Sequence, residues 1–406
     1  MKVCMISGSF PNMKCGVGDY TANLSRELAK DGICIDVITS HNLETTTKIE
    51  NGSERLAITL HPIMKNWGLE NTLPLLERIR QLNPDIIHVQ YQRGTYYSRE
   101  LILIFPVLAR FVFPDVPIIV TFHDLQAPYI LQRLLKSVSE HILFPWLILA
   151  DGIIVSNHGD SKRIRKMVPW VKTKIRQIPV GANVGVSAGG KKDKAAIRAR
   201  LGMVNGAILI STFCNVVFMN YIMLFKAMHS LIKDGYDLRL VVIGGIPAKS
   251  SKNDQLDKDY RQRIGVLAKK LEISEFLSYT GYLPPSEVSA YLSASDLCVQ
   301  LYWKGVSNRN ATFSTVLAHG LPTITTLGDE KPEGLIDYRN VIFVPCDNVK
   351  ALTIALGELI DSPALRLEIG RTALTLFQER YDWNKIARSI EELYNSSFYR
   401  YKKKKG

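Results

Sequence analysis

The sequence lacks an apolar run long enough to cross a membrane. Its two most apolar stretches, Leu101–Phe113 and Leu131–Leu149, are interrupted by Pro106 and Pro145, and both fall short of about 20 uncharged residues. Met1–Ser7 leads straight into an apolar strand pattern, without the charged, apolar and cleavage regions of a signal peptide. These absences predict a cytoplasmic protein without transmembrane helices.

Cysteine is scarce and shows no spacing typical of a metal site. The six cysteines are Cys4, Cys15, Cys34, Cys214, Cys298 and Cys346, most of them within apolar runs. Scattered thiols of this kind favour reduced, buried side chains over disulfides or zinc ligands. The sequence therefore predicts no metal site, and its cysteines agree with a cytoplasmic location.

Acidic residues are outnumbered by basic ones, which leaves a formal net charge of +13. Such an excess favours nucleic acid, an anionic lipid surface or phosphorylated small molecules as partners. Nucleic-acid modules concentrate basic residues on one face or interleave them with aromatic residues. Here the excess is spread along the chain, apart from Lys402–Lys405. We therefore rank nucleic acid last and predict no nucleic-acid partner.

Short β-branched runs alternate with longer helical patterns along the whole chain. In the first half the runs are Lys2–Ser7, Ile33–Thr39, Leu56–Leu60, Asp85–Tyr91, Pro117–Phe122, Gly152–Ser156 and Ile175–Pro179. In the second half they are Ala207–Phe213, Asp237–Gly244, Phe276–Thr280, Asp296–Leu301, Pro322–Thr326 and Val341–Val344. Because these runs are apolar on both faces, they predict an α/β fold with two Rossmann-like, doubly wound parallel sheets.

The predicted domain boundary lies in a small and polar stretch near Gly181–Asp193. We expect an N-terminal domain at residues 1–182 and a C-terminal domain at residues 194–380. A length of 406 residues also favours two or three domains over a single core. Open parallel sheets bind ligands beyond the carboxyl ends of their strands, so two facing sheets would form a deep cleft.

A loop with two glycines follows the first strand pattern and precedes a helical pattern at Tyr20–Lys30. Gly16 and Gly18 would let backbone N–H groups approach a phosphate or a sugar beside a helix N-terminus. No third spaced glycine and no Gly-Lys-Ser/Thr follows, so the loop is neither a dinucleotide fingerprint nor a P-loop. A ligand-binding loop and a plain tight turn both remain open.

His123 directly follows the strand pattern Pro117–Phe122, at the end where a ligand is expected. Its imidazole could donate a hydrogen bond to a sugar hydroxyl or to a leaving phosphate. The alternative is a histidine bonded within its own turn, with Asp124 as its partner. His88 lies in the middle of a strand pattern, which favours a position in the core.

The richest polar segment is Lys304–Thr312, which leads into a helical pattern at Phe313–His319. The hydroxyls of Ser307 and Thr312, together with the guanidinium of Arg309, would lie at the start of that helix. Phosphates favour such places because the helix dipole and open N–H groups add to a fixed cation. The segment favours an anion site over an ordinary capped surface helix.

Several short motifs occur in a fixed order over nearly the whole chain. They are Gly16-Val17-Gly18-Asp19-Tyr20-Thr21, Pro84-Asp85-Ile86-Ile87-His88, Thr121-Phe122-His123-Asp124, Asp151-Gly152-Ile153-Ile154-Val155-Ser156, Ile178-Pro179-Val180-Gly181, Thr280-Gly281-Tyr282-Leu283 and Ala318-His319-Gly320-Leu321-Pro322. In this order they resemble the retaining family-4 glycosyltransferases with the GT-B fold. The end of the chain resembles the family's closing helix, which predicts a helix at 381–398 that crosses back onto the first domain and a basic tail at 399–406.

The resemblance implies a hexosyltransferase in which an acceptor hydroxyl attacks C1 of a sugar and a nucleoside diphosphate leaves, with retention of configuration. It implies a UDP- or GDP-linked nucleotide sugar as substrate, no metal and no other cofactor. It assigns Gly16, Gly18 and His123 to the catalytic cleft. It also places Tyr282 and Leu283 where the nucleotide base lies, so that the C-terminal domain would bind the nucleotide sugar.

The chain departs from the family at its usual donor anchors. Many members hold the diphosphate with an arginine and a lysine, where this chain has Asn215 and Asn220. Many also carry two glutamates, where this chain has Ser307 and Thr315. The usual anchors are therefore absent.

A subset of relatives replaces the glutamate pair with a Ser-x-Arg-x-x-Ser/Thr loop, which Ser307, Arg309 and Thr312 match. The resemblance thus leaves Arg309 as the main cation of the donor site and a catalytic candidate. Lys304 and Lys226 are weaker candidates. Thr315 stays a candidate donor contact because it stands at the position of the second glutamate.

Two functions are open at this point. The chain is an active enzyme with an unusual diphosphate grip, or a catalytically silent relative that acts as a scaffold or partner subunit. A phosphorylase or an epimerase of the same fold is less favoured, since neither a pyridoxal-lysine context nor epimerase motifs are recognisable.

The stretches Leu101–Phe113 and Leu131–Leu149 also have two interpretations. They could lie on an anionic leaflet at the inner face of the membrane, helped by nearby basic residues and the lysine tail, or pack on the sheet as core helices. In the first case the natural acceptor is a glycan or a lipid-linked sugar. Tyr91 and Tyr129 could then stack on the sugar rings of that acceptor.

Overall fold

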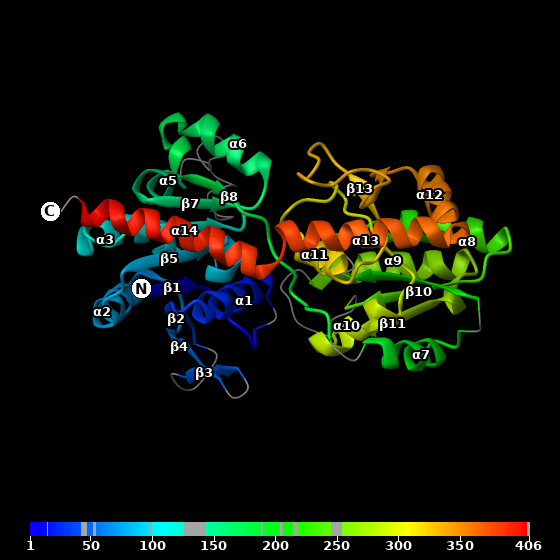
Figure 1. Cartoon of the computed structure of the whole chain (residues 1–406), viewed down its shortest axis with the longest axis horizontal. Coiled ribbons are helices and arrows are strands. Elements are labelled where there is room, and N and C mark those ends of the chain that lie inside the picture. The colour runs from blue at the N-terminus through cyan, green and yellow to red at the C-terminus, as the bar shows by residue number, and fades with distance from the viewer. Residues whose placement is uncertain are drawn as a thin grey trace. The chain divides into compact units, whose positions relative to one another are not determined.

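The computed structural model describes residues 1–13, 15–41, 47–51, 54–97, 99–125, 143–187, 190–203, 206–213, 218–244 and 254–403. The chain forms two compact units, one comprising Met1–Val180 with Trp383–Gly406 and the other Gly181–Asp382 (Figure 1). Each unit is built on a sheet of mostly parallel strands with helices around it, which confirms the fold class predicted from the sequence. The cleft between two facing sheets stays a prediction.

The first unit contains an eight-stranded sheet in the order β3-β4-β2-β1-β5-β6-β7-β8. Its strands are β1 (Lys2–Ser7), β2 (Cys34–Ser40), β3 (Thr47–Asn51), β4 (Glu54–Met64), β5 (Ile86–Tyr91), β6 (Ile118–Phe122), β7 (Gly152–Val155) and β8 (Ile175–Gln177). Neighbouring strands are parallel except β3 and β4, which pair antiparallel at the sheet edge.

Helices cover both faces of this sheet. They are α1 (Gly16–Lys30), α2 (Thr72–Leu82), α3 (Leu101–Val112), α5 (Phe144–Leu149), α6 (His158–Met167) and α14 (Trp383–Lys402), with short 3-10 helices η1 (Leu69–Asn71), η2 (Arg93–Tyr96) and η4 (Pro169–Lys174). On one face, Ile6 of β1 shares a buried cluster with Ile79 of α2 and Trp146 of α5. On the other face, Met5 lies against Ser25 of α1, as the alternation of side chains along a strand requires.

The second unit contains a six-stranded, fully parallel sheet in the order β11-β10-β9-β12-β13-β14. Its strands are β9 (Ile208–Phe213), β10 (Leu238–Ile243), β11 (Leu277–Gly281), β12 (Leu297–Gln300), β13 (Thr323–Leu327) and β14 (Ile342–Pro345). Its described helices are α7 (Gly190–Arg200), α8 (Tyr221–Lys233), α9 (Asp254–Lys270), α10 (Pro285–Ala294), α11 (Ala311–Ala318), α12 (Val349–Asp361) and α13 (Pro363–Arg380), with the 3-10 helix η6 (Ser274–Phe276).

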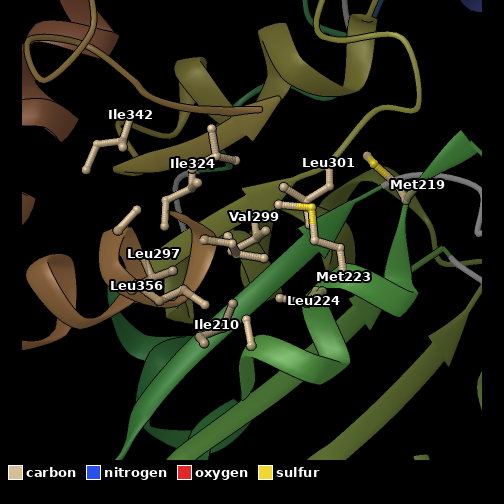
Figure 2. Packing of buried hydrophobic residues seen from close by; sticks show 14 of the residues in the cluster. Ile210, Met219, Met223, Leu224, Leu297, Val299, Leu301, Ile324, Ile342 and Leu356 are labelled. Carbon is tan, nitrogen blue, oxygen red and sulfur yellow. The ribbon is translucent and has the colours of Figure 1, made fainter. Parts of the chain in front are cut away.

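One apolar core of the second unit lies between its sheet and helices α8 and α12 (Figure 2), and a second lies on the other face, against α7 and α10. Strand residues Ile210, Leu297, Val299, Ile324 and Ile342 meet helix residues Met223, Leu224 and Leu356 in the first of these cores. Burying one such side chain stabilises a fold by about 1.5–3 kcal/mol. The apolar runs seen in the sequence are therefore explained by strands that are covered on both faces.

Three aspartates tie neighbouring strands together at their amino ends. Each aspartate stands directly before a strand and forms two hydrogen bonds with the neighbouring strand. The three are Asp85 before β5, Asp151 before β7 and Asp296 before β12. The backbone N–H of each aspartate donates to the carbonyl oxygen of one partner residue, and its carboxylate accepts from the backbone N–H of that same partner. All of these distances are 2.7–2.9 Å, and the partners are Lys2, Ile118 and Leu209 in turn. Arg110 and Arg198 add ion pairs to the second and third aspartates. This pairing fixes strand register in both units.

Helix α14 follows the second unit in the sequence but packs in the first, beside α1 (Figure 1). The Tyr394 hydroxyl lies 2.5 Å from Nδ1 of His88 in the central strand β5. Near the end of the helix, the Tyr401 hydroxyl donates to the Asp151 carboxylate at 3.0 Å. The last helix is therefore part of the interior of the first unit.

Candidate active site

The glycine loop of the first unit joins β1 to α1. A Cβ at Gly18 would lie 3.2 Å from the backbone of Phe10, so the first turn of α1 packs directly on the loop. Gly16, the first residue of α1, is exposed, and a Cβ there would have nothing within 4 Å. The helix begins without a side-chain cap, which leaves the donors of its first turn suited to an anion. Gly18 thus has a packing role, and Gly16 leaves space at the helix start.

His123 lies at the carboxyl end of β6 and beside the glycine loop's helix. Its backbone N–H donates to the carbonyl oxygen of Tyr91 at 2.9 Å. Its Nε2 lies 3.0 Å from Oε1 of Gln90. Its half-buried ring meets the edge of the Tyr20 ring, with centroids 4.7 Å apart. Since Tyr20 belongs to α1, the structure brings the two predicted parts of this site together.

His88 is fully buried in β5, which confirms the core position predicted for it. Its two ring nitrogens lie 2.5 Å from the Tyr394 hydroxyl and 2.8 Å from the Thr121 hydroxyl. Burial, and then the nearby charge of His123, lower the pKa of His88 to about 3. His88 is therefore neutral at physiological pH.

Tyr91 does not line a surface where an acceptor could bind. It is fully buried, and its ring packs against Phe122 and Trp146 at centroid distances of 5.3 and 6.4 Å. The prediction that Tyr91 stacks on an acceptor sugar is wrong, because β5 is a central strand with helices on both faces. Tyr129, the other predicted acceptor contact, lies outside the described residues.

In the second unit, the loop before α11 is organised by Asn310. Oδ1 of Asn310 accepts from the backbone N–H of Ser307 at 2.7 Å and lies 3.3 Å from the Ser307 hydroxyl. The backbone N–H of Arg309 donates to that hydroxyl at 3.4 Å. Arg309 is exposed, and α11 begins at Ala311 without a side-chain cap. The structure therefore places an exposed arginine at the uncapped start of a buried helix.

The loop at residues 304–310 is also held in place by close packing against neighbouring residues. Gly305 adopts a left-handed φ of 81°, and a Cβ there would lie 2.1 Å from the backbone nitrogen of Gly328 after β13. Oγ1 of Thr312 lies 3.1 Å from the hydroxyl of the buried Tyr302. These contacts bring Thr312 into the same loop and helix start as Ser307, as the sequence predicted for them.

Thr315 is placed differently from the prediction. Its side chain is fully buried, and its Oγ1 donates to the carbonyl oxygen of Ala311 at 2.9 Å. The same oxygen accepts from the backbone N–H of Asn183 at 3.1 Å and lies 3.4 Å from that of Val184. The predicted donor contact is corrected to a positioning role, because this hydroxyl ties residues 183–184 to α11.

Tyr282 and Leu283 follow the left-handed Gly281 at the end of β11. Tyr282 is 61% exposed, whereas Leu283 is partly buried against the apolar cluster beneath α10. The hydroxyl of Thr280 accepts from the backbone N–H of Gly244, which joins the carboxyl ends of β10 and β11. The Tyr282 ring is therefore exposed on a turn whose backbone is held by Leu283 and Thr280.

The asparagine at the family's lysine position has a structural role. Asn220 is buried and caps α8, accepting from the Met223 N–H at 3.1 Å and donating to the Cys346 carbonyl oxygen at 3.3 Å. Lys226 lines a groove of about 590 Å³ between α8 and α9. Its predicted place near the diphosphate is corrected, since it lies on the helix layer and not at the carboxyl end of the sheet. Asn215 lies outside the described residues.

Within the described ranges, no group of three or more His, Cys, Asp or Glu side chains is arranged to hold a metal ion. Over the same ranges, none of the helices has the length and apolar character needed to span a bilayer.

Family models match most of the chain. Glycosyltransferase Family 4 matches residues 15–185, and Glycosyl transferases group 1 matches residues 218–376. The chain belongs to these glycosyltransferases. The first match contains Gly16, Gly18 and His123, and the second contains Tyr282 and the loop of Arg309.

Similar proteins have related activities. This glycosyltransferase is 24% identical to the alpha-monoglucosyldiacylglycerol synthase of Streptococcus pneumoniae, over 83% of this chain and 75% of the relative. It is 23% identical to the D-inositol 3-phosphate glycosyltransferase of Corynebacterium aurimucosum, over 97% and 96%. The crystal structure of Anabaena HepE in complex with UDP-glucose superimposes with a TM-score of 0.69 and 14% identity, over 98% and 100% of the two chains. That likeness shows the GT-B fold.

Sequence reasoning missed two residues that organise this glycosyltransferase's candidate site. Gln90 holds His123, and Asn310 holds the Ser307 loop. Gln90 stands two positions after His88, on the same side of the strand, which was a usable signal. Asn310 stands three residues after Ser307, a spacing typical of side chains that close a turn.

Proposed function

We propose that this protein transfers a hexosyl group from a UDP- or GDP-linked sugar to a hydroxyl group of a glycan or lipid-linked acceptor, with retention of configuration and without a metal cofactor. Family membership supports sugar transfer. The observation that carries the donor site is the exposed Arg309 at the uncapped start of α11, in a loop held by Asn310.

The leaving diphosphate requires positive charge at the point where the glycosidic bond breaks. Arg309 supplies a fixed cation that can bind phosphate oxygens in two places, and the first turn of α11 supplies N–H donors and the positive end of its dipole. The hydroxyls of Ser307 and Thr312 would orient the diphosphate. The exposed ring of Tyr282 would lie against the nucleotide base, with Leu283 beneath it.

In the first unit, His123 would contact the donor sugar. Its ring is held by Gln90 and by the edge of Tyr20, so its position is defined before a ligand arrives. Gly16 would leave room for the sugar or a phosphate at the start of α1, since no described atom beyond its own helix and chain neighbours lies within 4 Å of the place where a side chain would begin. The complexes of Anabaena HepE with UDP and UDP-glucose support a nucleotide-sugar donor for this fold.

A second candidate function is a catalytically silent relative that serves as a scaffold or partner subunit. Two of the family's anchor positions favour it, because Asn220 is used to cap α8 and Thr315 is used to hold residues 183–184. A protein in which the residues at the donor-binding positions only stabilise the structure would keep the fold but would not transfer sugar.

Nucleotide binding and sugar release together separate the two functions. The experiment measures binding of UDP and GDP by calorimetry, and nucleoside diphosphate release from a panel of nucleotide sugars with and without acceptors. Arg309→Ala should weaken nucleotide binding by about tenfold or more, since a charge-assisted hydrogen bond contributes about 1.5–3 kcal/mol. Arg339→Ala, at another exposed arginine of the second unit, is the control and should leave binding unchanged.

The results expected for the two functions differ. Release that depends on Arg309 supports the transferase. Binding without release from any donor, in the presence of lipid and glycan acceptors, supports the silent relative. Binding that is equal in the Arg309 and Arg339 variants contradicts the donor site itself.

We also propose that the first unit binds an anionic membrane surface through α3. Leu101, Phe105 and other residues of α3 are buried against the sheet, whereas Ile104, Val107 and Phe111 are 39%, 49% and 87% exposed. Their spacing places them along one side of the helix. The helix is therefore both a core element and a carrier of exposed apolar side chains. A lipid-linked acceptor would then be within reach, as the name of the Streptococcus pneumoniae relative suggests for that protein.

Basic residues lie near the end of this helix. Arg110 of α3 donates to the hydroxyl of Tyr401, which directly precedes the exposed Lys402 and Lys403 in the chain. Apolar side chains next to lysines favour a surface with anionic lipids. Residues 126–142, which include most of the second apolar stretch, lie outside the described residues.

Liposome sedimentation tests this surface. The protein should sediment with vesicles that contain anionic phospholipid, and less so as the salt concentration rises. Phe111→Ser should weaken sedimentation severalfold, whereas Leu73→Ser, at a side chain that is 71% exposed on α2, should not. Equal sedimentation of both variants, or none with any vesicle at low salt, would reject the membrane proposal.

A further inference from the structure

A buried chain of polar side chains lies behind His123, and the proposed reaction does not use it. Oε1 of Gln90 is 3.0 Å from Nε2 of His123, and Nε2 of Gln90 is 3.3 Å from Nε2 of His88. Nε2 of His88 is also 2.8 Å from the Thr121 hydroxyl, and its Nδ1 is 2.5 Å from the Tyr394 hydroxyl. All of these side chains except His123 are buried. This series of hydrogen-bonded side chains leads from Tyr394 in helix α14, through the central strands, to His123.

The protons in this chain follow from counting donors and acceptors. His88 is neutral and carries one N–H, because burial and the charge of His123 lower its pKa to about 3. The amide nitrogen of Gln90 lies 3.3 Å from Nε2 of His88, and an NH2 group only donates, so the imidazole nitrogen is the acceptor and the Thr121 hydroxyl donates to it as well. The N–H of His88 is therefore on Nδ1 and donates to Tyr394. Both assignments follow from the orientation of Gln90 in the structure, with its amide nitrogen on His88 and its carbonyl oxygen on His123.

With its amide nitrogen turned to His88, Gln90 presents its carbonyl oxygen to His123. A carbonyl oxygen only accepts hydrogen bonds. Nε2 of His123 must then carry a proton in order to pair with it. In neutral His123 the other ring nitrogen, Nδ1, consequently has a lone pair and can only accept.

We propose that Gln90, His88 and Tyr394 are positioning residues that fix the proton of neutral His123 on Nε2. His123 would then accept a hydrogen bond from a donor-sugar hydroxyl through Nδ1, and would donate there only as the imidazolium. This inference rests on the proposed function for its consequence in catalysis, but the proton position is a property of the ligand-free protein. It also replaces the hydrogen-bond donor expected from the sequence with an acceptor at neutral pH.

The described side chains that face the His123 ring include Tyr20 and Gln90. Tyr20 meets the ring, and burial raises its pKa, so it stays neutral. His88 is neutral and acts through Gln90. Asp124 is the next residue in the chain and carries the nearest formal negative charge in sequence. The protonation of His123 should therefore respond to a change at Gln90, whose side chain lies on its Nε2.

Nuclear magnetic resonance of the imidazole nitrogens tests the inference without any substrate. In protein with ¹⁵N-labelled histidine, His123 should show a protonated Nε2 and an unprotonated Nδ1 at pH 8, with its signals assigned by their loss in His123→Asn. Tyr394→Phe removes the acceptor of the His88 N–H. It should move the proton of His88 to Nε2, reverse Gln90 and move the proton of His123 to Nδ1.

The control is Tyr399→Phe, on the same helix but 62% exposed and outside the chain of hydrogen bonds. It should leave the His123 signals unchanged. A protonated Nδ1 on His123 in the wild-type protein, or the same His123 signals in wild type and in Tyr394→Phe, would overturn the inference.

A kinetic experiment tests the consequence for catalysis. Gln90→Glu places a carboxylate on Nε2 and stabilises the imidazolium, so the midpoint of the acidic limb of kcat against pH should rise by about one unit or more. Gln90→Leu should lower kcat at least tenfold with less than a twofold change in KM for the donor. Unchanged pH profiles in both variants would contradict the positioning role.

The two tests separate the inference from the function. If no sugar transfer is found under any condition, the proposed function fails, while the nuclear magnetic resonance result still decides the proton position. If transfer is found and the His123 proton is on Nδ1, the function stands and the inference fails.

Discussion

The hydroxyl of Thr315 lies 3.1 Å from the backbone nitrogen of Asn183, 132 positions earlier in the chain. The resemblance to the family-4 glycosyltransferases places this position at a glutamate that binds the donor in many members. Here a smaller side chain has become a bridge between α11 and the segment that enters the second unit. In this protein the position therefore stabilises the second unit itself, through the contact of α11 with residues 183–184.

Thr315→Val should lower the free energy of unfolding of the protein by about 1–3 kcal/mol, because buried backbone N–H groups lose their acceptor. The matched control is Thr353→Val in α12, where the hydroxyl makes the same bond to the carbonyl oxygen four residues back but holds no other segment. Urea unfolding followed by circular dichroism measures both. Equal losses in the two variants would argue against the bridge.

Asn310→Ala should weaken nucleotide binding, because the Ser307 loop loses the acceptor that folds it. We expect about a tenfold loss of affinity, or about 1.4 kcal/mol, measured by calorimetry with UDP and GDP. Asn348→Ala is the control, since Asn348 caps α12 through the Ala351 N–H at 2.9 Å, away from the loop. Both variants should lose about 1 kcal/mol of stability, and only the first should lose affinity.

The two glycines of the first loop should respond differently to alanine. Gly18→Ala should destabilise the protein by about 1–3 kcal/mol, because its Cβ would press on the backbone of Phe10. Gly16→Ala should change stability by less than about 0.5 kcal/mol, since the position is open. If Gly16→Ala nevertheless lowers sugar transfer, a ligand occupies that space. Thermal unfolding and turnover, measured on the same samples, decide between a ligand-binding loop and a plain turn.

His88 should make stability depend on pH below neutrality. Its pKa is about 3 in the folded protein, against the ordinary value of 6.5. Between these values the unfolded chain binds a proton that the folded protein does not bind. The free energy of unfolding therefore falls as the pH is lowered from 6.5, by up to about 1.4 kcal/mol per unit. Above pH 6.5 neither state is protonated, and the contribution vanishes.

Comparison of wild type with His88→Gln isolates this effect. Between pH 7.5 and 5.0 the wild type should lose about 2 kcal/mol more than the variant. Other titrating groups, including the half-buried His319, are present in both proteins and cancel in the difference. Parallel pH dependence of the two proteins would show that His88 is not the group responsible.

Strands with apolar side chains on both faces were predictable from the sequence, because burial leaves a direct compositional signal. Residues 207–213 predict a strand that the structure places at Ile208–Phe213. The strand Thr47–Asn51 was not predicted, since it is polar and pairs antiparallel at the sheet edge, where one side faces no further strand. Helix starts were also less certain: the helix expected at Tyr20–Lys30 begins at Gly16.

The candidate site was predictable only where its residues lie close together in the sequence. Ser307, Arg309 and Thr312 share one loop and helix start, and local spacing was enough to group them. The partners of His88 could not be foreseen, because Tyr394 is 306 positions away. Tyr91 was misplaced for a related reason, since an aromatic residue at a strand end has the same sequence pattern whether it is covered by a helix or open.

The position of α14 has a consequence for the order in which this protein can fold during synthesis. The strands of the first unit leave the ribosome early, yet His88 stays without its phenol partner until residue 394 has been added. A nascent chain must therefore build the whole second unit before the half made first can close its interior. The interior of the first unit is therefore completed by a helix that the chain supplies only after all of the second unit.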